Sequence, residues 1–106
     1  MEHEFCVVLT TTNSKMVKQR LIDIILLNKL AACIQTVPIE SYYVWEGEVC
    51  NDNEILLSIK TQTKHYKKLV DLIEKHHDYD VPQIIQIPIV EGFDPYLSWI
   101  KSNTTR

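Results

Sequence analysis

The range 31–61 constrains the fold more than any other part of this chain, because it reads as two long extended segments joined by a tight turn. The first segment contains the aromatic run Tyr42–Trp45, and the turn is Glu46-Gly47-Glu48. Glycine in a short polar gap between aromatic and β-branched residues is a hairpin signal. Pro38 lacks the amide that a central strand donates, so it indicates a bulge, a bend or a sheet edge. The polar residues 51–53 predict an interruption of the second segment near the turn.

The segments that flank this hairpin alternate between strand and helix patterns. Residues 5–12 form a short apolar, β-branched run that is typical of a buried strand. Asn13 and Ser14 offer an N-cap for a helix over about 14–29, whose apolar residues recur at helical spacing. A second helix with an apolar stripe is expected over about 63–77.

The end of the chain adds a strand and a short helix. The apolar run 84–90 predicts a strand, and Pro88 inside it again indicates an edge or a bulge. Asp94 is the expected N-cap of the last helix, over 95–101, because Pro95 then takes the first helical position, where its missing amide costs nothing.

The resulting order of elements is β-α-β-β-α-β, followed by one extra helix. Two helices on one face of an antiparallel sheet in this order form a ferredoxin-like sandwich, so the expected fold class is α+β. A chain of 106 residues has the size of one domain. We therefore expect a single domain over 1–106.

The length of the hairpin predicts an oligomer. At about 3.3 Å per residue, two arms of roughly 12 to 15 residues reach beyond a compact body of this size. Tyr43 and Trp45 alternate with Tyr42 and Val44, so apolar and aromatic side chains occupy both faces of the arm. Such an arm is expected to be buried by another subunit. The alternative is a hairpin that folds back over the protein's own helices.

Composition limits the partners and the compartment. The formal net charge of −3 gives no electrostatic reason to expect nucleic acid or an anionic membrane. The first four residues are acidic where a targeting segment is basic, and no apolar run approaches the ~20 residues of a membrane span. Cys6, Cys33 and Cys50 are odd in number and widely spaced, which favours reduced thiols. Cys6 and Cys33 are expected in the core, and a cytoplasmic protein is expected.

Other functions of the same topology are disfavoured by missing residues. An RNA-recognition module needs aromatic side chains on its third strand, and the range 54–60 has none. A metallochaperone needs M-x-C-x-x-C after the first strand, and an acyl-phosphate hydrolase needs an anion-binding loop with an arginine there. The sequence Thr-Thr-Thr-Asn-Ser at 10–14 supplies neither. Since no enzyme active site is recognisable, we predict a protein without catalytic activity.

Five short motifs occur in order along the chain: Ala31-Ala-Cys33, Tyr43-Val-Trp-Glu-Gly47, Ile59-Lys-Thr61, His77-x-Tyr79-x-x-Pro82 and Tyr96-Leu-Ser-Trp-Ile100. Together they resemble the CutA family of divalent-cation tolerance proteins, over about 5–100. The resemblance implies a ferredoxin-like protomer that assembles into a homotrimer through its long hairpin, similar to the trimeric PII signalling proteins. It also implies ligand grooves between subunits and a non-enzymatic response to divalent metal ions, with copper as the usual candidate.

The resemblance also identifies one candidate metal ligand. Family members proposed to bind copper have a cysteine at the end of the first strand, a histidine at the end of the second helix and a glutamate after the loop proline. The matching positions here are Thr10, His77 and Gln83. Without the thiolate and the carboxylate, one imidazole is left. His77 is therefore the candidate ligand for Cu(II) or another divalent cation, and no cofactor is certain. The alternative is a surface histidine at a helix end.

Four residues form a candidate ligand groove: Trp45, Lys60, Tyr79 and Gln83, which the resemblance places near subunit junctions. A lysine beside aromatic side chains can hold an anionic or planar ligand. The alternative is that Trp45 and Tyr79 only pack the trimer together. Two functions remain open: a trimer that responds to metal ions by ligand binding or signalling, and a structural trimer that scaffolds or chaperones an unidentified partner protein without a small ligand.

Overall fold

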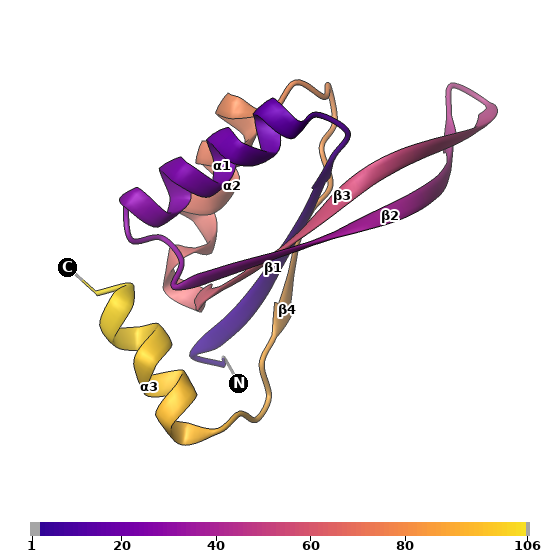
Figure 1. Ribbon diagram of the computed structural model, residues 1–106. Helices are drawn as coiled ribbons and strands as arrows, with labels where there is room; N and C mark the ends of the chain where they lie inside the picture. Colours follow the sequence, from indigo (N-terminus) through magenta and orange to yellow (C-terminus); the bar gives the residue numbers. More distant parts are fainter. Residues whose placement is uncertain (1–2, 106) are drawn as a thin grey trace.

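The computed structural model describes residues 3–105, which form an α+β chain with a four-stranded antiparallel sheet and three α-helices (Figure 1). The strands pair in the order β2-β3-β1-β4. This confirms the expected order of elements, including the additional helix at the end. The bounds are β1 Phe5–Thr12, α1 Lys15–Leu27, β2 Cys33–Trp45, β3 Glu48–Gln62, the 3-10 turn η1 Thr63–His65, α2 Tyr66–His76, β4 Ile84–Pro88 and α3 Asp94–Asn103.

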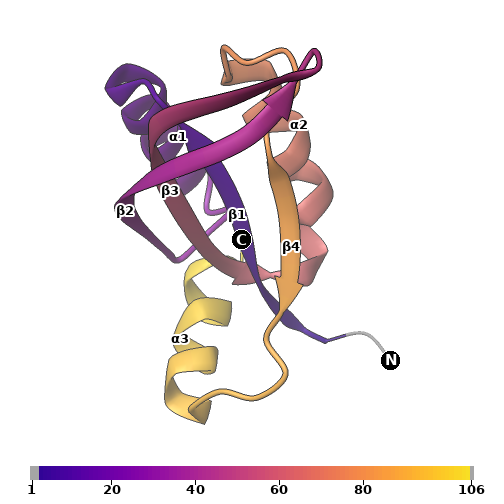
Figure 2. The same ribbon diagram turned by 90° about the vertical axis from the view of Figure 1, so that its right-hand side faces the viewer.

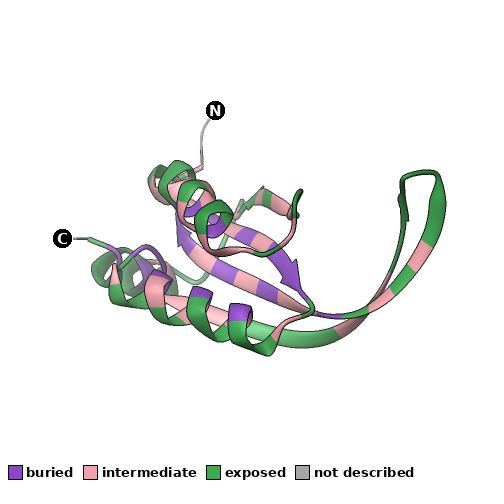
Figure 3. Ribbon diagram, turned by 90° about the horizontal axis from the view of Figure 1, so that it is seen from above, coloured by how far each residue is buried: buried purple, intermediate pink, exposed green. Residues whose placement is uncertain are grey.

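The hydrophobic core lies between the sheet and the two helices α1 and α2, which cover one face of the sheet (Figures 1 and 3). Side chains alternate between the faces of a strand, so every second residue of β1 and β3 points toward the helices. Burial of this apolar surface is the main favourable contribution to folding. The fully buried members are Cys6 and Val8 of β1, Leu57 and Ile59 of β3, Leu21 and Ile25 of α1, and Leu69 and Ile73 of α2.

The helices begin at polar signals in the sequence, with one correction. Ser14 is the N-cap of α1, and its hydroxyl accepts a hydrogen bond of 3.2 Å from the amide of Val17, as predicted. The N-cap of α3 is Phe93, so the prediction of Asp94 as N-cap was wrong. The extended backbone of Phe93 directs its carbonyl to the first turn, and Asp94 lies inside that turn, where the helix dipole favours a carboxylate. No helix within 3–105 is both long and apolar enough to cross a membrane.

The hairpin closes through a two-residue turn that fixes its register. Glu46 and Gly47 have φ angles of 50° and 78°, the left-handed pair that matches the twist of the flanking strands. The predicted interruption at 51–53 was wrong, because β3 continues through these residues and pairs with β2. The amide side chain of Asn51 adds to this pairing by donating to the Ser41 carbonyl at 3.2 Å.

The two prolines within strands, Pro38 and Pro88, lie at sheet edges, which was one of the explanations predicted for them. Pro38 belongs to β2 and Pro88 to β4, and these strands are the two edges of the sheet. Since only one side of an edge strand pairs, a missing amide is tolerated there. β2 therefore continues past Pro38, whereas β4 ends at Pro88, two residues before the predicted end at 90.

The hairpin projects beyond the body of the molecule, which measures 44 × 27 × 22 Å (Figures 1 and 3). Three of its apolar side chains are mostly exposed: Tyr42 at 70%, Val44 at 69% and Val49 at 80%. A hairpin folded over its own helices would have buried them. That alternative was wrong, and the exposed arm in this single chain is the feature that predicts a covering subunit.

The cysteines divide between the two faces of the sheet. Cys6 lies in the core as predicted, and burial raises the pKa of its thiol. Cys33 was expected there too, but that prediction was wrong: it lies opposite Lys60 and is only partly buried. Lys60 alternates with the buried Ile59 and Thr61, so its cross-strand neighbour Cys33 shares the face that the helices do not cover.

The last helix is fastened to the end of the sheet away from the hairpin tip (Figure 2). Thr104 is fully buried, and its hydroxyl accepts a hydrogen bond of 2.8 Å from the side-chain amide of Gln62. Its carbonyl contacts Nε2 of His65 at 2.6 Å. Hydrogen bonds of Thr104 and burial of Ile100 therefore both hold α3 against the rest of the chain.

Candidate ligand site at the base of the hairpin

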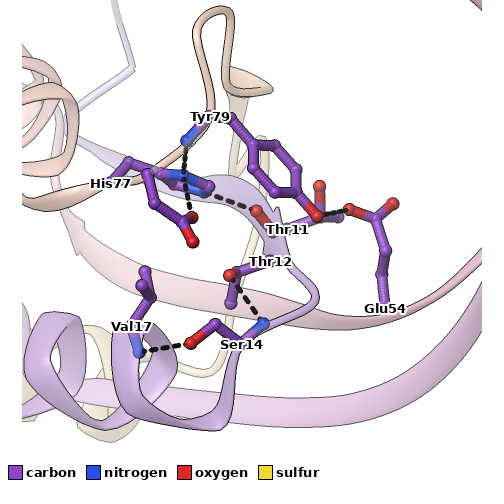
Figure 4. A network of polar contacts seen from close by, with 8 residues as sticks. Thr11, Thr12, Ser14, Val17, Glu54, His77 and Tyr79 are labelled. Carbon is purple, nitrogen blue, oxygen red and sulfur yellow. Dashed lines mark hydrogen bonds and ion pairs between the residues drawn. The ribbon is translucent and has the colours of Figure 1, made fainter.

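His77 connects the end of β1 to the loop after α2, here called the 77–83 loop (Figure 4). It is the first residue beyond α2, and its extended backbone ends the helix. Its side chain is 0% exposed. Nε2 lies 2.7 Å from the Thr11 carbonyl, and the amide of Tyr79 donates to Nδ1 at 3.1 Å. The interpretation of His77 as a surface histidine was therefore wrong, because the loop folds over the ring.

The contacts of His77 identify its tautomer. Nδ1 also lies 3.4 Å from Asp78 Oδ1, a contact that would need a proton on Nδ1. That proton is incompatible with the shorter bond from the Tyr79 amide, and Asp78 is 55% exposed to water. We therefore assign the neutral ring with its hydrogen on Nε2, which donates to the Thr11 carbonyl. Both ring nitrogens then have hydrogen-bond partners within the chain.

Tyr79 joins the same loop to the hairpin. Its hydroxyl donates to Glu54 Oε2 at 2.7 Å, and its ring centroid lies 4.6 Å from that of His77. Burial and the neighbouring Glu54 carboxylate raise the pKa of the Tyr79 phenol. The phenol therefore remains a hydrogen-bond donor to the carboxylate at neutral pH.

These contacts form one wall of a cavity of about 750 Å³ between the hairpin and the 77–83 loop. Three of the four residues of the predicted groove line it: Trp45, Tyr79 and Gln83. The remaining lining residues come from the end of β1, from the two arms of the hairpin and from the loop. They are Thr11, Asn13, Glu40, Ser41, Tyr42, Tyr43, Asp52, Glu54, Asp80, Val81 and Pro82.

Lys60 does not line this cavity. It lies further along β3, where its ammonium group donates to Gln35 Oε1 and stands 5.7 Å from the ring centroid of Tyr96 in α3. The predicted combination of a lysine with Trp45 and Tyr79 is therefore not brought together within this chain. Ligand binding by the other three residues stays a prediction.

Thr10 stands where the resemblance expects a cysteine. It is fully buried, and its hydroxyl has no hydrogen-bond partner in the described part of the chain. Its neighbour on the same face, Thr12, is also fully buried, but its hydroxyl accepts from the Ser14 amide at 3.1 Å. A buried hydroxyl without a partner keeps its desolvation cost uncompensated.

Replacing Thr10 with valine is expected to raise the free energy of unfolding by about 1 kcal/mol, because the isosteric side chain removes the unpaired hydroxyl. Urea denaturation at matched protein concentration measures this change. Thr12→Val is the matched control, and it is expected to lower stability, since the Ser14 amide loses its acceptor. Equal effects of the two substitutions would contradict the distinction between these hydroxyls.

The described residues do not form a complete metal site by themselves. Within 3–105, no three side chains of histidine, cysteine, aspartate or glutamate are grouped so that they could hold an ion. His77 would have to give up one of its two hydrogen bonds before a ring nitrogen could coordinate a metal. His77 as a metal ligand stays a prediction.

Sequence reasoning missed the carboxylates of the cavity. The turn at Glu46 and Gly47 places Asp52 opposite Ser41, so it lies diagonal to Tyr43, whose hydroxyl donates to it at 2.7 Å. A register counted back from the turn would have predicted this pair. The contact between Glu54 and Tyr79 depends on the tertiary position of the loop, and no local pattern indicates it.

Comparison with known proteins identifies the family. The profile described as "CutA1 divalent ion tolerance protein" matches residues 6–103. The chain belongs to the CutA family. The divalent-cation tolerance protein CutA of Thermus thermophilus is 41% identical over 99 residues, which cover 92% of this chain and 96% of the relative. The chloroplastic protein CutA of Arabidopsis thaliana is 43% identical over 92% of this chain, which spans about half, 54%, of that relative's length.

Solved CutA structures share the fold. CutA1 from Shewanella sp. SIB1 superposes with a TM-score of 0.94 at 34% identity and covers 100% of both chains. CutA1 from Oryza sativa gives a TM-score of 0.92 at 42% identity, covering 97% of this chain and 95% of that one. The family assignment from five short motifs is therefore confirmed, and the Thermus thermophilus relative is named a divalent-cation tolerance protein.

Proposed function

We propose that this CutA protein contributes to tolerance of divalent cations without catalysing a reaction, as a homotrimer that binds a ligand and responds to it. The names of its relatives support the association with divalent cations. The order of its elements supports a ferredoxin-like protomer of the kind that builds PII-like trimers. The single domain would then be one third of the functional unit.

The observation that carries this proposal is the cavity beside an exposed apolar arm. The cavity is lined from the hairpin, the end of β1 and the 77–83 loop, and the mostly exposed Tyr42 lines it from the hairpin. A second copy packed on the hairpin would bury Tyr42, Val44 and Val49 and narrow the open side of the cavity. Assembly and ligand binding would thereby be coupled.

Copper is the candidate ion, and His77 is its candidate ligand. Because this chain groups no three metal-ligating side chains within 3–105, further ligands would have to come from a neighbouring copy. Calorimetric titration of Cu(II) into the purified protein near pH 7 tests this. The proposal expects saturable binding at one site per chain that is lost in His77→Gln.

His77→Gln is more specific than an alanine substitution, because the glutamine amide keeps a donor for the Thr11 carbonyl while the imidazole is removed. His76→Gln is the matched control at the adjacent position of α2, and its Cu(II) binding is expected to match that of the unmodified protein. Equal weak binding in all three proteins would remove His77 from the metal hypothesis.

A structural trimer that scaffolds a partner protein is the second candidate. It is favoured by the hydrogen bonds that both ring nitrogens of His77 make within the chain. These bonds hold the loop to the sheet without a metal ion. Recovery of a stoichiometric protein partner from a protein that binds neither Cu(II) nor a small molecule would support it.

A cytoplasmic location remains part of the proposal, supported by the free thiols of Cys6, Cys33 and Cys50. Relatives are named chloroplastic in Arabidopsis thaliana and periplasmic in Archaeoglobus fulgidus, so the family occupies more than one compartment. Fractionation of the native cells would decide it.

A further inference from the structure

The charges of this chain are distributed unevenly, and its helices are basic. The ranges 15–29 and 63–76, here called the helix layer, hold eight of the 11 lysine and arginine residues but only three of the 14 aspartate and glutamate residues. The net charge of −3 is thus the sum of a basic helix layer and a more strongly acidic remainder. Figure 3 shows the outward sides of both helices exposed. A surface with one sign of charge attracts partners of the opposite sign, whatever the net charge of the molecule.

A groove of about 450 Å³ lies along α2 beside the end of α1. Its apolar lining residues are Leu30, which is 7% exposed, and the half-buried Leu72. Lys68 and Lys75 line the groove one helical turn before and one turn after Leu72. The groove therefore combines apolar surface with two ammonium-bearing side chains about 10 Å apart along the helix axis.

The two lysines of this groove are not neutralised by the chain itself. Both are exposed, and neither forms an ion pair with a residue in 3–105. Asp71 is the single carboxylate among the described lining residues, so the lysines outnumber it. The histidines of the lining differ: Nε2 of His65 lies 2.6 Å from the Thr104 carbonyl oxygen, whereas His76 has no such contact with the described residues. The groove keeps an excess of positive charge.

The lining favours an acidic protein segment over other polyanions. Two cations on either side of an apolar side chain match two carboxylates on either side of a leucine. Bases of a single-stranded nucleic acid stack on aromatic rings, and no phenylalanine, tyrosine or tryptophan is among the described lining residues. A membrane surface is flat, and a half-buried side chain such as Leu72 between two exposed lysines does not insert into it.

We infer that this groove binds an acidic segment of a partner protein, with carboxylates on both sides of an apolar side chain. Lys68 and Lys75 bind the carboxylates, and Leu72 contacts the apolar side chain between them. The inference uses neither the hairpin nor the cavity at its base, so it is independent of the ligand binding proposed there. It assigns a partner chemistry to a second face of the molecule.

Fluorescence anisotropy with labelled synthetic peptides and the full chain tests the inference. The probe is the peptide EELEELEE, and its matched controls are QQLQQLQQ, which lacks the charge, and EESEESEE, which lacks the leucines. We expect EELEELEE to bind saturably and about tenfold or more tightly than either control. Its affinity is expected to fall as the salt concentration rises, because salt screens exposed charges.

Double variants at exposed lysines locate the binding site. Lys68→Gln with Lys75→Gln removes both lysine charges of the groove and is expected to weaken EELEELEE binding by about tenfold or more. Lys64→Gln with Lys67→Gln removes the same charge from neighbouring positions that do not line the groove, and it is expected to weaken binding by less than about threefold. Asp71→Asn is expected to tighten binding by about twofold or more, since it removes the opposing carboxylate.

Four results would overturn the inference. Failure of EELEELEE to bind at millimolar concentration would remove the acidic segment as a partner. Equal weakening by the two double variants would mean that the helix layer as a whole attracts the peptide. Equal affinity for EELEELEE and EESEESEE would remove the apolar contact. Tighter binding of duplex DNA or phosphatidylserine vesicles, lost in Lys68→Gln with Lys75→Gln, would assign the groove to that class instead. Chain mass and Cu(II) titration are separate measurements, so none of these results changes the proposed function.

Discussion

Replacing His77 with alanine is expected to lower the free energy of unfolding by about 3 kcal/mol. The imidazole is 0% exposed, and it satisfies the Thr11 carbonyl and the Tyr79 amide. Alanine would leave both backbone groups without these partners and would leave a space where the ring lay. Urea denaturation followed by circular dichroism measures the loss, at a fixed chain concentration because the proposed assembly would also stabilise the fold.

His76→Ala is the matched control for this prediction. His76 precedes His77 at the end of α2 and is partly exposed, and its side chain has no hydrogen bond or ion pair with the residues at 3–105. Its replacement is expected to change stability by no more than about 0.5 kcal/mol. Equal stability of the two variants would mean that the buried contacts of His77 contribute nothing.

Placing charges at the hairpin tip is expected to prevent assembly of the proposed trimer. Val44 and Val49 lie directly opposite each other and are among the most exposed apolar side chains of the arm. The pair Val44→Glu and Val49→Lys keeps an attractive cross-strand contact within the chain, but its burial under a neighbouring copy would be costly. Sedimentation equilibrium is expected to show the mass of a single chain.

The control for the hairpin variant lies on α1. Met16→Glu with Leu27→Lys replaces two apolar residues that are 73% and 83% exposed, outside the hairpin. Its mass is expected to match that of the unmodified protein. A hairpin variant that keeps the full mass while folded would show that the tip is not part of the interface.

The fold was largely predictable because its signals are local. Periodicity located the helices, Ser14 marked the start of α1, and Gly47 marked the turn. The errors arose where backbone context outweighed a side-chain preference. Asn51 continues a strand because β2 pairs with it, and Cys33 leaves the core because the register places it opposite Lys60.

The site was predictable only in part. Trp45, Tyr79 and Gln83 line one cavity, and the family resemblance had already grouped them as candidate groove residues. Lys60 lies six residues beyond Glu54 on β3, about 20 Å along an extended strand. It therefore does not reach the cavity, although the resemblance grouped it with the other three residues. The negative charge of the cavity depends on segments that only the tertiary fold brings together.

Sedimentation equilibrium of the unmodified protein at micromolar concentration tests the central claim most directly, because the function proposed above depends on a neighbouring copy at the hairpin. The account predicts three times the chain mass of 12.4 kDa. The mass of a single chain across that concentration range would contradict it, since the exposed hairpin and the open side of the cavity would then face water.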